Sequence, residues 1–271
     1  YINILSKVYN TMDFQFKSLT VEKEYIGIAF CDSKSRLLGY AKKLDQLSKK
    51  QISSQLKSDL SFQTRNSKLF DYCVIHNPNN LKLSKLYIFK LKDYINYSIR
   101  DFQILGGNLT SLISFYREDK VGIYPDGIIS KKVSFINGIS EMLTGSLLAS
   151  YKFNKYKKID NKKDKTKKTS RVKIYSSSYT RLEKNYINAV AVSEGTTLTR
   201  NLVTEPPNVM TPPEIAKNAE LLEKIGIKVT VLGEKEMTKL GMGSLLSVGR
   251  ASEYESKLAI MEWKGHKNKK K

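Results

Sequence analysis

The chain has 271 residues, 40% of them hydrophobic, which is enough for one large domain or two ordinary ones and excludes global disorder. The formal net charge of +21 either favours nucleic acids or anionic surfaces as partners or reflects the lysine-rich composition of an AT-rich genome. Two cysteines in unrelated segments argue against a disulfide framework. No apolar run approaches the roughly 18 residues of a membrane span, so we expect a cytoplasmic protein with no membrane partner.

Strands and helices alternate through the first two thirds of the chain. Short apolar runs predict strands at 25–30, 72–76, 86–91, 121–124 and 172–175. Apolar residues at helical spacing predict helices over 37–60, with a break near 48–50, and over 97–116 and 135–150. This alternation is typical of an α/β domain with a largely buried, mostly parallel sheet.

A basic segment at 152–173 interrupts this order, because it contains eleven lysines and arginines but only two aspartates. It is either a solvated loop or a nucleic-acid-binding loop, since Tyr151, Phe153 and Tyr156 interleave with the lysines. The residues that would contact nucleic acid in the second interpretation are Lys157, Lys158, Lys162 and Lys163.

A long helix is predicted over 180–203, and its many small residues suit a tightly packed helix between domains. Two Pro-Pro pairs follow, and the next helix starts at once. Thr211 is placed to be its N-cap and Pro212 its first residue, where a missing N–H costs nothing. With Glu214 at the third helical position, Thr211-x-x-Glu214 predicts a capping box.

Beyond this joint, a second α/β pattern begins. The spacing predicts helices at 212–225, 234–240 and 243–249, and strands at 227–232 and 257–263. Two strands are too few for an independent core. We therefore expect apolar residues such as Leu258, Ile260 and Trp263 to remain uncovered, with poor solubility or dependence on a partner as the consequence.

Two segments closely resemble the leucyl aminopeptidase (cytosol aminopeptidase, M17) family. They are 199–211 (Thr-Arg-Asn-Leu-Val-Thr-Glu-Pro-Pro-Asn-Val-Met-Thr) and 231–249, which contains a Lys-Leu-Gly-Met-Gly-Ser-Leu-Leu run. The Tyr-Lys-Phe-Asn-Lys-Tyr run at 151–156 and the strand at 258–263 are also similar to family segments. The resemblance is specific over about 185–265 and 146–158. It covers the N-terminal portion of the family.

The resemblance implies a small N-terminal α/β domain like a macro domain, followed by the start of an α/β catalytic domain. The expected parts are an N-terminal domain over 1–178 with its basic loop at 152–173, a linking helix over 179–203, and an incomplete catalytic domain over 204–271. The family implies a cytoplasmic, metal-dependent exopeptidase that removes N-terminal residues from peptides. Two divalent metals, Mn or Zn, would activate water and polarise the scissile carbonyl. A homo-hexamer is also implied, although an incomplete catalytic domain disfavours it in this chain.

The family's metal ligands come from a Lys-Gly-x-Thr-x-Asp-x-Gly-Gly segment and an Asn-Thr-Asp-Ala-Glu-Gly-Arg segment, and neither occurs in this sequence. Substitutes are lacking as well. His76 and His266 lie in different domains, and Cys31 and Cys73 show no ligand spacing. We assign no catalytic, metal-binding or substrate-binding residue, and expect no cofactor to be bound by this chain.

The sequence leaves four interpretations open. The chain is a truncated N-terminal portion of an aminopeptidase, inactive alone, or a binding module that uses the basic loop for nucleic acid or a partner. Alternatively, it joins a separately encoded catalytic half, or it is a decaying gene fragment.

Overall fold

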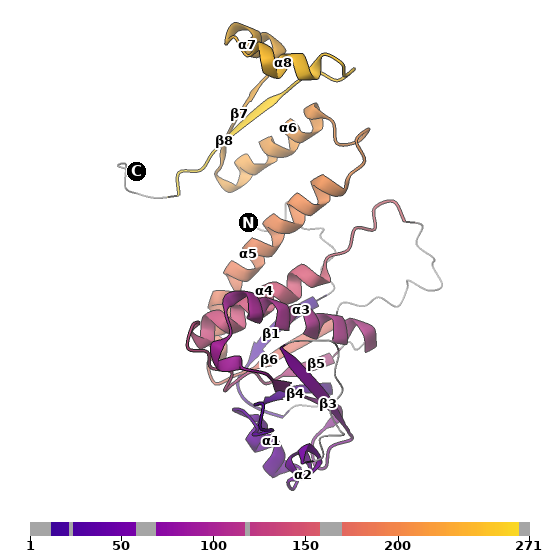
Figure 1. The fold of residues 1–271 in the computed structure, drawn as a ribbon, viewed down its shortest axis with the longest axis vertical. Helices are drawn as coiled ribbons and strands as arrows, with labels where there is room; N and C mark the ends of the chain where they lie inside the picture. The colour runs from indigo at the N-terminus through magenta and orange to yellow at the C-terminus, as the bar shows by residue number, and fades with distance from the viewer. Residues whose placement is uncertain (1–11, 22–23, 58–68, 117–119, 158–169, 266–271) are drawn as a thin grey trace. The chain divides into compact units, whose positions relative to one another are not determined.

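The computed structural model describes residues 12–21, 24–57, 69–116, 120–157 and 170–265 of the chain (Figure 1). The chain divides into two compact units, one spanning residues 6–197 and one that contains residues 198–271. We call them the N-terminal unit and the C-terminal unit. Each unit has its own β-sheet.

A six-stranded sheet forms the centre of the N-terminal unit. Its strands are β1 (Met12–Lys17), β2 (Glu24–Cys31), β3 (Phe70–His76), β4 (Leu83–Leu91), β5 (Lys120–Ile123) and β6 (Ser170–Tyr175). They lie in the order β1-β6-β5-β2-β4-β3, and every neighbouring pair is parallel except β3 with β4. The predicted α/β class with a mostly parallel sheet is confirmed.

Strand β1 is the one strand of this sheet that the sequence analysis missed. It pairs in parallel with β6 at the edge of the sheet. Met12, Phe14 and Phe16 are buried, and the polar residues between them are exposed. This strict alternation is the signal of a strand with one buried face, and it could have been read from the sequence.

Helices cover both faces of this sheet (Figure 1). They are α1 (Ala41–Leu47), α2 (Gln51–Leu56), α3 (Ile99–Tyr116), α4 (Phe135–Ser150) and the 26-residue α5 (Tyr179–Thr204). Side chains from α1 and α2 pack in one apolar cluster on one face, and those from α3, α4 and the start of α5 pack in another on the opposite face. The predicted break near 48–50 is confirmed, because Lys49 and Lys50 take left-handed backbone conformations with φ of 55° and 62° between α1 and α2.

Helices α3 and α4 approach each other closely at Gly106. A Cβ atom at this position would overlap the carbonyl oxygen of Met142 on α4. The close approach lets Ser146 Oγ donate to the carbonyl oxygen of Gly106 at 3.0 Å, and Thr110 Oγ1 to that of Ser146 at 3.2 Å. The glycine that would weaken an isolated helix is therefore the residue that permits the packing here.

The C-terminal unit contains every element that the sequence predicts beyond the joint. They are α6 (Pro212–Glu220), a 3₁₀ turn (Leu221–Ile225), β7 (Lys228–Leu232), α7 (Glu234–Lys239), α8 (Gly243–Gly249) and β8 (Leu258–Glu262). Strands β7 and β8 pair in an antiparallel, two-stranded sheet, and α6 contacts both strands. Among its described residues the buried apolar ones are Ala216, Ala219 and Met237.

The predicted capping box at the start of α6 is wrong. The helix does begin at Pro212, after Thr211 in an extended conformation, but the Thr211 side chain caps no backbone amide. The Glu214 carboxylate instead accepts from Asn218 Nδ2 at 3.4 Å and lies 3.7 Å from Lys217 Nζ. Since the prolines at the first helical positions have no N–H, fewer backbone N–H groups at the start of the helix require a hydrogen-bond partner.

The predicted exposure of apolar side chains around the small sheet is confirmed at two of the three named positions. Ile260 is 42% exposed and Trp263 is 67% exposed, and Met261 adds a further exposed apolar side chain. Leu258 is half-buried and lies opposite Leu232 in the sheet.

Candidate functional site

The parallel strands of the large sheet end at one edge, where α/β proteins commonly bind their ligands. After β2 the chain turns to α1 on one face, and after the neighbouring β5 it turns to α4 on the other face. Such a reversal usually opens a ligand-binding crevice between the two strand ends.

In this protein the loops that follow β2 and β5 fill the space between the two strand ends. Gly39 has a φ of 47°, and a Cβ atom there would overlap the carbonyl oxygen of Asp126, so the two loops are in direct backbone contact. Beneath them the rings of Tyr40, Tyr124 and Tyr175 stack, with centroid distances of 5.5 and 5.0 Å. The switch point of the sheet is therefore closed by packing.

The carboxylate of Asp126 holds this closure together. It accepts from Ser176 Oγ, from the Ser177 backbone N–H at 3.0 Å and from Ser177 Oγ at 2.8 Å. These serines follow β6, so Asp126 joins the ends of two neighbouring strands. Its role is structural, since its oxygens are occupied by the chain.

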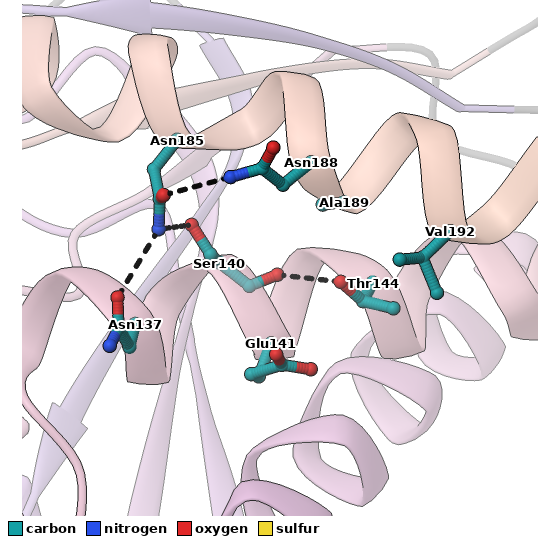
Figure 2. A pocket seen from close by; sticks show the side chains of 8 residues that line it. All are labelled: Asn137, Ser140, Glu141, Thr144, Asn185, Asn188, Ala189 and Val192. Carbon is teal, nitrogen blue, oxygen red and sulfur yellow. Dashed lines mark hydrogen bonds between the residues drawn. The ribbon is translucent and has the colours of Figure 1, made fainter. Parts of the chain in front are cut away.

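A polar cleft lies between α4 and α5 (Figure 2). We call it the α4/α5 cleft, and its volume is about 260 Å³. The residues that line it are Asn137, Ser140, Glu141, Thr144, Asn185, Asn188, Ala189 and Val192. Six of these eight side chains are polar, and all come from the two facing helices.

Hydrogen bonds across the α4/α5 cleft set the positions of its amides. Asn185 on α5 donates from Nδ2 to Ser140 Oγ at 2.9 Å and, at 3.4 Å, to Asn137 Oδ1, both on α4. Asn188 Nδ2 donates to Asn185 Oδ1 at 3.4 Å (Figure 2). Thr144 Oγ1 donates to the Ser140 carbonyl at 3.1 Å within α4. The wall is thus a connected set of neutral groups.

Glu141 is the single charged residue among the described residues that line the cleft. Gln103 on α3 donates from Nε2 to Glu141 Oε2 at 2.7 Å, which fixes the orientation of the carboxylate. A separate, more open hollow of about 620 Å³ lies beside the start of α3 and has Arg100 and Lys132 in its lining. The two hollows therefore differ in the sign of their charge.

The carboxylates of the C-terminal unit are engaged with the chain's own groups at several positions where a two-metal centre would need free ligands. Glu234 Oε1 accepts from the Ser256 N–H at 2.9 Å, and Glu236 Oε2 accepts from the Gly233 N–H at 3.0 Å. Glu255 pairs with Lys257 Nζ at 2.6 Å. Among the described residues no group of three or more His, Cys, Asp or Glu side chains is placed to hold a metal ion. This donor set does not fit two divalent cations.

Cys31 and Cys73 are buried in one apolar cluster of the N-terminal unit. Burial raises the pKa of the Cys31 thiol to about 12 and that of the Cys73 thiol to about 11, so both are protonated at neutral pH. His76 ends β3 on the surface. His266 lies outside the described residues. Of the described residues among these, none is placed for catalysis.

Of the four lysines proposed for nucleic acid contact, the structure describes only Lys157. Its side chain is exposed, and its backbone N–H donates to the Asn154 carbonyl at 3.1 Å. Lys158, Lys162 and Lys163 lie outside the described residues, so their role stays a prediction.

Comparisons with known proteins agree on one class of protein. Residues 197–271 match the model of the cytosol aminopeptidase family, catalytic domain. A probable cytosol aminopeptidase of Brucella anthropi is 42% identical over 134 residues, which are 49% of this chain and 27% of that protein. One of Rhizobium leguminosarum bv. trifolii is 33% identical over 193 residues, which are 71% of this chain and 38% of that protein.

Solved structures show the same fold. A tomato leucine aminopeptidase mutant has a TM-score of 0.69 at 17% identity. The match covers 92% of this chain and 50% of the tomato chain. The bottromycin maturation enzyme BotP in complex with Mn has a TM-score of 0.62 at 13% identity, covering 89% of this chain and 45% of its own. These identities establish likeness of fold alone.

The two α/β units and the match that begins at the end of α5 define a protein of the aminopeptidase class of folds. The chain belongs to the cytosol aminopeptidase (M17) family. It spans 27% and 38% of the length of the two curated relatives named above. In the described part of the chain, no helix combines the length and apolar character needed to cross a membrane.

Proposed function

We propose that this chain provides the N-terminal α/β unit and the opening of the catalytic domain of a metal-dependent aminopeptidase, and that it does not hydrolyse peptides by itself. The observation that carries the proposal is the family match over 197–271. It falls on a unit in which the carboxylates of Glu234, Glu236 and Glu255 are bound to the chain's own amides and lysine.

The proposed inactivity follows from the chemistry that a two-metal hydrolase requires. Several carboxylates must remain available to divalent cations while a bound water attacks the scissile carbonyl. Neither of the family's carboxylate-bearing segments occurs within these 271 residues. Any such chemistry would need ligands from polypeptide outside this sequence.

The test is an assay of the purified 271-residue chain with a leucine anilide substrate and added Mn²⁺ or Zn²⁺. We expect no turnover above a blank. Metal-dependent turnover that co-elutes with the chain through two chromatographic steps and disappears with EDTA would refute the proposal. Co-purification of a separately encoded peptidase would instead identify the chain as one half of a divided enzyme.

The family also supports proposals about location and assembly. The relatives are named cytosol aminopeptidases, and we propose a cytoplasmic location for this protein. A homo-hexamer is the assembly to test first, by sedimentation at several concentrations. The proposed domain limits at 178/179 and 203/204 can be tested by limited proteolysis.

Nucleic-acid binding is a second candidate, favoured by the excess of eleven basic over two acidic residues in 152–173. Binding of this kind should weaken steeply as salt increases. Replacing Lys157, Lys158, Lys162 and Lys163 with Gln should lower the affinity and the salt dependence. Unchanged affinity in this variant would eliminate the candidate.

A further inference from the structure

The charge of the α4/α5 cleft is opposite to that of the chain as a whole. The chain carries a formal net charge of +21, yet among the described residues no lysine or arginine lines this cleft. The one charged side chain among the described lining residues is that of Glu141, which is negative. A hollow with this lining attracts cations, in contrast to the neighbouring hollow lined by Arg100 and Lys132.

The hydrogen bonds inside the cleft leave particular groups available to a ligand. Gln103 occupies Glu141 Oε2, and no described residue donates to Glu141 Oε1. Asn188 uses its Nδ2 on Asn185, and no described residue donates to Asn188 Oδ1. These two groups are acceptors and suit a ligand that brings donors, while the exposed Asn137 Nδ2 is a donor with no described acceptor.

The cleft is also held in a defined shape without a ligand. Ser140 and Thr144 are buried, and the Asn185 amide bridges to α4 at 2.9 Å. Gln103 on α3 holds the carboxylate of Glu141 from the other side. Few groups therefore need to be ordered on binding, which favours recognition of a small molecule.

We propose that the α4/α5 cleft binds a small primary amine in its ammonium form, with Glu141 as counter-ion and the asparagine amides as partners for a second polar group of the ligand. A volume of about 260 Å³ suits a small molecule. The expected affinity is weak, about millimolar, because so few atoms make contact. The proposed site lies in the N-terminal unit and is independent of peptidase activity.

The test compares three compounds with one carbon skeleton by ligand-observed NMR on the full chain. They are 4-amino-1-butanol (a cation), 1,4-butanediol (neutral) and 4-hydroxybutyrate (an anion). We expect the amine to bind up to about five-fold more tightly than the diol, in line with a partly exposed ion pair. The net positive charge of the chain works in favour of the anion, so a preference for the cation reports the cleft itself.

Two variants locate the effect. Glu141→Gln keeps the shape of the side chain and should reduce amine binding to the level of the diol. Glu183→Gln is the matched control, because Glu183 is exposed on α5 and does not line the cleft. Circular dichroism checks that both variants fold.

A third variant keeps the proposal testable if Glu141→Gln does not fold. Asn188→Asp adds a carboxylate to the exposed wall of the cleft and should strengthen amine binding several-fold. Equal binding of all three compounds, preference for the anion, or an unchanged amine affinity in both cleft variants would overturn the proposal.

Discussion

The two units of this protein are built from the same alternation of strands and helices, yet they differ in what they bury. In the N-terminal unit, helices cover both faces of a six-stranded sheet, and large side chains such as Phe102 and Tyr87 are fully buried. In the C-terminal unit, the largest buried apolar side chain among the described residues is Met237.

The difference shows that forming strands and helices does not by itself create a buried apolar core. A strand forms wherever its residues can pair, but an apolar side chain is buried only when neighbouring strands and helices surround it. Two strands with α6 against them leave Ile260, Met261 and Trp263 exposed. Exposed apolar surface of this kind usually marks an interaction site or an aggregation risk.

The largest effect should come from truncating the core of the N-terminal unit. Phe102 is fully buried beside Tyr97, with ring centroids 5.7 Å apart, and Phe102→Ala should lower the free energy of unfolding by about 3–5 kcal/mol. The matched variant Trp263→Ala in the C-terminal unit should change it by less than about 0.5 kcal/mol. Urea unfolding followed by circular dichroism measures both. Similar losses in the two variants would break the contrast between the units.

A smaller effect should follow from a single methyl group at the closest helix contact. Gly106→Ala should cost about 1–3 kcal/mol, because the new Cβ would overlap the Met142 carbonyl and push α3 away from α4. The neighbouring Gly107→Ala is the control, since a Cβ there meets Ala149 only at 3.6 Å and should be neutral or stabilising. Thermal unfolding of both variants gives the comparison, and equal destabilisation would contradict it.

The smallest change in stability is expected on the small sheet. Ile260→Thr keeps a residue type that favours strands and replaces an exposed apolar group, so unfolding should change by less than about 0.5 kcal/mol. Aggregation, measured by light scattering at fixed protein concentration, should slow. If stability falls as it does for Phe102→Ala, then Ile260 belongs to a core and the contrast between the units fails.

Periodicity in the sequence located most elements, because each signal is carried by residues close together in the chain. The break near 48–50 and the start of α6 at Pro212 are both confirmed. Strand β1 was missed although its alternation is plain. The capping box failed because Glu214 bonds along the helix surface to Asn218, an arrangement that the Thr-x-x-Glu spacing does not reveal.

The α4/α5 cleft could not be predicted in the same way. Asn185 and Ser140 are 45 residues apart in sequence and meet only because α4 and α5 pack side by side on one face of the sheet. No motif marks them, and each residue alone is typical of an ordinary helix surface.

The sequence by itself determined the α/β class, the helices and strands of the C-terminal unit, and the resemblance to the M17 family, since all of these depend on local pattern or on runs of residues. Only the tertiary structure decided that packing of Gly39 on Asp126 closes the sheet's switch point, and that the polar residues of α4 and α5 form an acidic cleft in a basic protein. The physical reason is that burial and cavities arise between elements, where residues distant in the chain exclude or admit solvent together.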